Sequence, residues 1–111
     1  MRILVVDDEP RLAAAVKRGL EAEGFAVDVA ATGDEGLWMA TEVAYDAIVL
    51  DIMLPGISGY TVCARLREAG VWTPILMLTA KNGEYDEAEA LDTGADGYLS
   101  KPFSFVVLVA H

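Results

Sequence analysis

The chain has 111 residues, which suits a single domain, and its hydrophobic fraction of 54% is enough for a substantial core. Its 18 acidic and 8 basic residues give a formal net charge of -10. This charge argues against nucleic-acid or anionic-membrane binding and favours cationic partners such as metal ions. The single cysteine excludes an internal disulfide. With neither a signal peptide nor a membrane-length apolar run in sight, we expect a cytoplasmic protein without membrane partners.

The first half of the chain predicts two strand–helix units. Residues 3–6 are apolar without interruption, which is typical of a strand covered on both faces. A helix is expected from Pro10 to about residue 23, where Gly24 is a stop signal. Residues 25–30 alternate in polarity, which predicts a strand at the edge of the sheet. A capping box then predicts a helix over residues 32–43.

The second half continues the alternation, with expected strands at 47–50, 75–78 and 97–100 and expected helices at 58–70, 84–93 and 104–111. Residues 105–109 would also suit a strand, but the alternation favours a helix, which we expect to be cut short at residue 111. Regular alternation of strands and helices predicts an α/β domain with a parallel sheet and right-handed crossovers.

Candidate functional residues follow the predicted strands. Asp7 and Asp8 follow the first strand, Asp51 the third, Thr79 the fourth and Lys101 the fifth. Each alone has an ordinary explanation, such as a helix cap for an aspartate or a solvated side chain for the lysine. Ligands of open parallel sheets bind at the carboxyl ends of the strands. The shared position of all five residues therefore indicates a single site.

Three neighbouring carboxylates repel one another unless a cation lies between them. Mg²⁺ accepts carboxylate, carbonyl and water oxygens and leaves positions for a phosphate oxygen. A carboxylate beside such an ion can act as a nucleophile towards phosphorus. Phosphoryl transfer mainly needs alignment and charge neutralisation, to which a lysine and a hydroxyl group contribute.

Four sequence blocks, at residues 5–9, 50–56, 78–80 and 101–103, resemble the signatures of two-component response-regulator receiver domains. The block at residues 94–99 and the sequence at residues 53–55 look closest to the OmpR/PhoB type. The resemblance covers the whole chain, residues 1–111. It implies a doubly wound five-stranded sheet of the flavodoxin/CheY-like kind, with strand order 2-1-3-4-5. It also implies a C-terminal effector domain outside these residues, expected to be a winged-helix DNA-binding domain that regulates transcription.

The resemblance assigns Asp51 as the acceptor of a phosphoryl group from a sensor histidine kinase. Asp8, Asp51 and the backbone carbonyl of Met53 would bind Mg²⁺, or Mn²⁺ as an alternative, and Asp7 would act through water. None of these residues is expected to act on an external substrate, so the protein is expected to catalyse only its own phosphorylation and dephosphorylation.

The same resemblance assigns phosphoryl binding to Thr79, Lys101 and the backbone of Ala80. Thr79 and Tyr98 would form the switch pair that changes the face made by residues 84–93, 97–100 and 104–111. The Lys101–Pro102 peptide bond is a candidate for the cis form, which is accessible to X–Pro bonds.

The switch face usually forms a homodimer held by charged pairs. This chain departs from that pattern at Glu89, Gly97, Val107 and His111, which argues against the usual symmetric dimer.

Two other functions fit parts of the pattern. An aspartate-nucleophile phosphohydrolase usually has a second acid two residues after the nucleophile, where this chain has Met53. A degenerate receiver that acts only as a binding module would not need the complete set of carboxylates, threonine and lysine.

Overall fold

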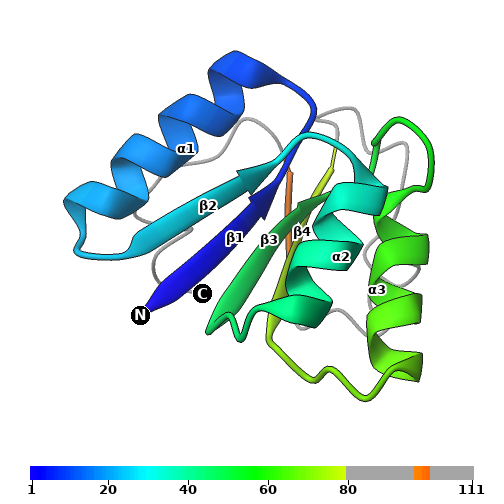
Figure 1. Ribbon diagram of the computed structural model, residues 1–111. Helices are drawn as coiled ribbons and strands as arrows, with labels where there is room; N and C mark the ends of the chain where they lie inside the picture. Colours follow the sequence, from blue (N-terminus) through cyan, green and yellow to red (C-terminus); the bar gives the residue numbers. More distant parts are fainter. Residues whose placement is uncertain (80–96, 101–111) are drawn as a thin grey trace.

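The computed structural model describes residues 1–79 and 97–100 (Figure 1). Its strands pair in parallel in the order β2-β1-β3-β4-β5. They are β1 (Arg2–Val6), β2 (Ala26–Ala30), β3 (Ala47–Asp51), β4 (Ile75–Thr79) and β5 (Gly97–Ser100). The predicted parallel α/β class is confirmed, and β2 lies at an edge of the sheet, as its alternating pattern predicts. The helices expected at 84–93 and 104–111 lie outside the described residues.

Three helices connect the strands: α1 (Pro10–Ala22), α2 (Gly33–Glu42) and α3 (Gly59–Glu68). Helices α2 and α3 begin as the sequence predicts. The Thr32 hydroxyl accepts a hydrogen bond from the Glu35 amide at 3.1 Å, and the Ser58 hydroxyl accepts one from the Thr61 amide at 3.3 Å. Such caps satisfy amide groups that have no partner inside the helix. Local sequence therefore determines the residues at which these two helices begin.

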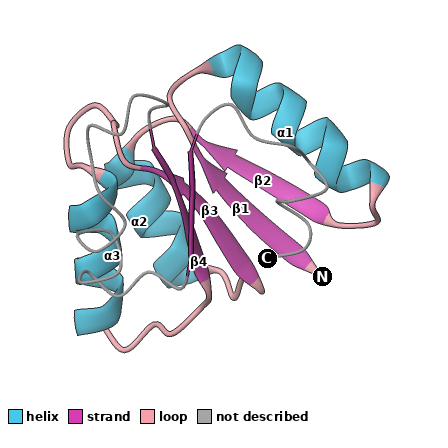
Figure 2. Ribbon diagram, turned by 180° about the vertical axis from the view of Figure 1, so that it is seen from behind, coloured by secondary structure: helices cyan, strands magenta, loops and turns pink. Residues whose placement is uncertain are grey.

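Helices cover both faces of the sheet. Helix α1 lies on one face, and α2 and α3 lie on the other (Figures 1 and 2). Leu4 and Val6 of β1 belong to the core under α2 and α3, whereas Ile3 and Val5 belong to the core under α1. Successive side chains of a strand point to opposite faces, so a strand buried on both faces must be apolar at every position.

A cluster of three polar side chains stabilises the edge of the sheet at β2. The Tyr45 hydroxyl donates to Asp28 Oδ2 at 2.7 Å, and Arg2 Nη1 forms an ion pair with the same oxygen at 3.1 Å. The hydrogen bond from Tyr45 is the main cause that lowers the pKa of Asp28, and the charge of Arg2 adds to it. Burial and the bond to Asp28 raise the pKa of Tyr45 to about 12. Residues from β1, β2 and the loop before β3 are thereby held together.

Replacing Tyr45 with phenylalanine should lower the free energy of unfolding near neutral pH by about 1–2 kcal/mol, because Asp28 loses its hydroxyl donor. The stabilisation from Asp28 is present above its unfolded-state pKa and is lost as the pH falls through its lowered folded-state pKa. That from Tyr45 is present below its unfolded-state pKa and is lost as the pH rises towards about 12.

Urea unfolding of the parent and Tyr45→Phe as a function of pH measures both effects. In Tyr45→Phe, the free energy of unfolding should change less with pH in the acid range. It should also lose the decrease at alkaline pH that Tyr45 causes in the parent. Identical pH profiles would contradict this role of the hydroxyl.

Candidate metal centre

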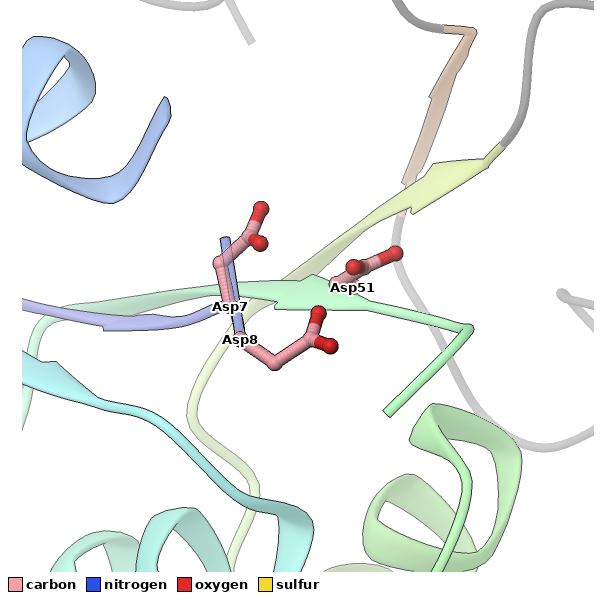
Figure 3. A group of neighbouring side chains, drawn as sticks. All are labelled: Asp7, Asp8 and Asp51. Atoms are coloured by element: carbon pink, nitrogen blue, oxygen red, sulfur yellow. The ribbon is translucent and has the colours of Figure 1, made fainter. Parts of the chain in front are cut away.

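Three aspartates meet where β1 and β3 end. Asp51 is the last residue of β3, and Asp7 and Asp8 follow β1 directly. The two strands are parallel neighbours with Val6 opposite Leu50, so their carboxyl ends lie at the same edge of the sheet. Figure 3 shows the three side chains gathered at this edge. The sheet thus brings together the carboxylates that the sequence predicts for one site.

The three carboxylates are close but differ in exposure. One oxygen from each lies within 4.8 Å of the others. The side chains of Asp7 and Asp51 are buried, with exposed fractions of 2% and 4%, whereas Asp8 is exposed. Burying a carboxylate is costly unless hydrogen bonds or a cation stabilise its charge. The exposed Asp8 leaves the cluster open to solvent on one side.

Backbone amides orient the two buried carboxylates. The Glu9 amide donates to Asp7 Oδ1 at 2.9 Å, and the Met53 amide donates to Asp51 Oδ1 at 3.3 Å. The residue at the cap position of α1 is Glu9, and its side chain makes no cap hydrogen bond. Neither Asp7 nor Asp8 is therefore the cap residue of α1, because the cap position falls on Glu9, after both of them.

The donor set fits Mg²⁺. Magnesium–oxygen distances are about 2.0–2.1 Å, so opposite ligands of an octahedral ion lie about 4.2 Å apart. Neighbouring ligands of such an ion lie about 2.9 Å apart, so the aspartate oxygens, which lie within 4.8 Å of one another, must move closer to bind it together. Carboxylate oxygens are also the hard ligands that this ion prefers. Side-chain rotations could bring two of the oxygens to an ion directly and leave the third within reach of a water molecule on it.

The structure describes some of the other predicted site residues and not the rest. Met53 is half-exposed in the loop after β3. Thr79 ends β4, the strand next to β3, and Tyr98 lies on β5 opposite Met77. Ala80, Lys101 and Pro102 lie outside the described residues, as do Glu89, Val107 and His111, and Gly97 is the first residue of β5. The described backbone thus places the ends of β3, β4 and β5 at one edge of the sheet.

Gly59, at the start of α3, is a residue at this site that the sequence patterns do not reveal. A Cβ atom there would collide with the backbone carbonyl of Asp51. The glycine directly after the helix cap Ser58 is the only local signal, and by itself it indicates no more than a helix start. Its proximity to Asp51 depends on how α3 packs against β3.

Comparison with known families decides what kind of domain carries this cluster. The family model described as "Response regulator receiver domain" matches residues 3–111. The chain belongs to the response regulator receiver domain family. The predicted family is therefore confirmed.

Curated relatives of this receiver domain are transcriptional regulators. Transcriptional regulatory protein TcrA of Mycobacterium tuberculosis is 52% identical over 111 residues, all of this chain and 44% of TcrA. Transcriptional regulatory protein DltR of Streptococcus agalactiae is 49% identical over 111 residues, all of this chain and 50% of DltR. The receiver domain thus spans about half the length of these relatives. Their names are consistent with the OmpR/PhoB type.

Solved structures agree with the receiver fold. The Francisella response regulator 1452 receiver domain superposes with a TM-score of 0.92 at 35% identity, covering 98% of this chain and 90% of that one. Response regulator TrrA of Thermotoga maritima, solved in complex with Mg²⁺-BeF, has a TM-score of 0.86 at 37% identity and covers 98% and 93% of the two chains. Within residues 1–79 and 97–100, the receiver domain has no helix that is both long and apolar enough to span a membrane.

Proposed function

We propose that this receiver domain is a phosphorylation-activated switch, with Asp51 as the acceptor. The observation that carries the proposal is the burial of Asp51 at the end of β3, with carboxylate oxygens of Asp7 and Asp8 within 4.8 Å. A carboxylate oxygen of Asp51 attacks the phosphorus of a phosphohistidine on a sensor histidine kinase. The O–P bond forms, the N–P bond breaks, and the histidine nitrogen leaves with the electron pair.

The aspartate cluster is proposed to hold Mg²⁺, or Mn²⁺ in its place, through Asp8, Asp51 and the backbone carbonyl of Met53. The bound ion neutralises negative charge on the carboxylates and the phosphoryl oxygens. Asp7 would act on the ion through water. The similarity to TrrA, which was solved with Mg²⁺-BeF, supports this assignment.

The remaining residues are proposed to bind the phosphoryl group and relay the change. Lys101, Thr79 and the backbone of Ala80 bind its oxygens, and the Lys101–Pro102 bond is a candidate cis peptide. Thr79 and Tyr98 then switch the face made by β5 and the helices expected at 84–93 and 104–111. A doubly wound arrangement that includes these two expected helices is part of the proposal.

We propose three partners for the longer protein: a sensor histidine kinase, DNA bound through a domain beyond this chain, and a second copy at the switch face. The DNA-binding role is supported by relatives that are transcriptional regulators about twice as long as this chain. The departures at Glu89, Gly97, Val107 and His111 argue against the usual charged pairs in a dimer. A cytoplasmic location suits a partner kinase and DNA.

The decisive experiment is intact mass after incubation with Mg²⁺ and acetyl phosphate. The parent should gain the mass of one phosphoryl group, and Asp51→Asn should gain none, because an amide cannot form the acyl phosphate. Circular dichroism checks that both proteins are folded.

An adduct on Asp51→Asn would place the acceptor elsewhere. If the folded, Mg²⁺-bound parent formed no adduct, the switch proposal would be overturned in favour of a degenerate receiver that only binds.

A further inference from the structure

The loop between β3 and α3, residues 52–58, is held between two glycines. This loop contains Met53, whose carbonyl is a proposed metal ligand, and it begins directly after Asp51. Gly59 lies at its end and Gly33 lies across from it on α2. We infer that Gly59 and Gly33 are positioning residues, which keep the loop where Asp51 and the Met53 carbonyl can share one divalent ion. The inference rests on the proposed function of Asp51.

Gly59 lies directly against the backbone of the proposed acceptor. A Cβ atom at this position would collide with the Asp51 carbonyl oxygen and would be 2.8 Å from Ile52 Cα and 3.0 Å from the Asp51 carbonyl carbon. The Gly59 amide also donates to the Ile52 carbonyl at 2.9 Å. These three nearest atoms all belong to the backbone, which cannot move away by a change of rotamer. A side chain at Gly59 would therefore displace either α3 or the end of β3.

Gly33 limits the same loop from the other side. A Cβ atom there would collide with the Ile57 carbonyl oxygen and would be 2.7 Å from Ile57 Cγ1. Gly33 is the first residue of α2 and is buried, and the side chain of Thr32 caps this helix. The capped N-terminus of α2 thus packs directly against the loop at Ile57.

The spacing of the metal ligands depends on these two contacts. The carboxylate of Asp51 must remain within 4.8 Å of those of Asp7 and Asp8 or move closer to them, whereas Asp7 and Asp8 follow another strand. Moving the backbone of Asp51 would change this spacing, and moving Ile57 would shift the loop that contains Met53, in neither case removing a ligand. Changes around metal ligands typically weaken metal binding by about 10–100-fold.

The test is a Mg²⁺ titration of the uniformly ¹⁵N-labelled chain, followed by backbone amide shifts. Gly59→Ala should weaken Mg²⁺ binding by about 10-fold or more. Gly33→Ala should weaken it in the same direction but less, because part of its crowding comes from the flexible Ile57 side chain. The Mg²⁺ concentration for half-maximal phosphorylation by acetyl phosphate should rise in parallel, and excess Mg²⁺ should restore the yield.

Leu20→Ala is the matched control for general destabilisation. Leu20 is a buried residue of α1, the helix that covers the opposite face of the sheet from α2 and α3. It should lower the stability measured in urea without Mg²⁺ and leave Mg²⁺ affinity unchanged. If Gly59→Ala does not fold, Gly33→Ala decides the question.

Parent-like Mg²⁺ affinity in a folded glycine variant would overturn the positioning role, as would an equal loss of affinity in Leu20→Ala. Failure of the parent itself to bind Mg²⁺ or to form the phosphoryl adduct would overturn the proposed function instead.

Discussion

Replacing Asp8 with asparagine should weaken Mg²⁺ binding by about 100-fold or more, because losing the charge of a proposed direct ligand costs more than the 10–100-fold loss typical of a supporting residue. Asparagine keeps the size of the side chain but removes its charge. Phosphorylation of Asp51 by acetyl phosphate should fall with the fraction of metal-bound protein. The loss should therefore be largest at low Mg²⁺ concentration.

The same substitution should raise the melting temperature when divalent ions are removed with a chelator. Asp8 lies with Asp7 and Asp51 in a group whose oxygens are within 4.8 Å. Repulsion between unit charges about 4 Å apart is about 4 kcal/mol at an effective dielectric constant of 20 and about 1 kcal/mol in water. Because Asp8 is exposed, its contribution belongs to the lower part of this range. The variant should thus be more stable without metal and gain less from Mg²⁺ than the parent.

Thermal melts over a range of Mg²⁺ concentrations measure both effects. Glu21→Gln is the matched control, since it removes one negative charge from an exposed position on α1. Its Mg²⁺ dependence should be that of the parent. An equal change in the two variants would assign the effect to net charge and contradict a ligand role for Asp8.

Replacing Leu4 with alanine should lower the free energy of unfolding by about 2–5 kcal/mol, the usual cost of a cavity in a packed core. Leu4 is fully buried in β1, between Asp28 of β2 and Ile48 of β3, and belongs to the core under α2 and α3. Typical domains are stable by about 5–15 kcal/mol, so this loss is a large part of the total.

Urea unfolding followed by circular dichroism measures the loss. The slope of the free energy of unfolding against urea concentration should be the same as in the parent. Trp38→Ala is the comparison, because Trp38 is a larger side chain that is 65% exposed. Its effect should stay within about 0.5 kcal/mol, as for other surface substitutions. A similar loss in both variants would show that burial in this core does not control stability.

Local sequence was sufficient to predict the helices and strands of the first 79 residues. Helix starts depend on contacts three residues apart, such as Thr32 with Glu35 and Ser58 with Thr61. The uninterrupted apolar run of β1 reflects burial on both faces, which its own composition shows. The same hydrophobic patterns predict that Asp7, Asp8 and Asp51 lie at the carboxyl ends of strands. Together with the resemblance to receiver domains, this was enough to predict the candidate site.

Long-range packing decided the rest. Strand composition does not reveal that β1 lies between β2 and β3, and the predicted strand order came from the family resemblance. Nor does it show that Asp7 is buried while its neighbour Asp8 is exposed. The contact of Gly59 with Asp51 and the bond of Tyr45 to Asp28 join residues that are separate in sequence. Such contacts depend on how helices and strands pack in three dimensions, because local propensity acts only over a few residues.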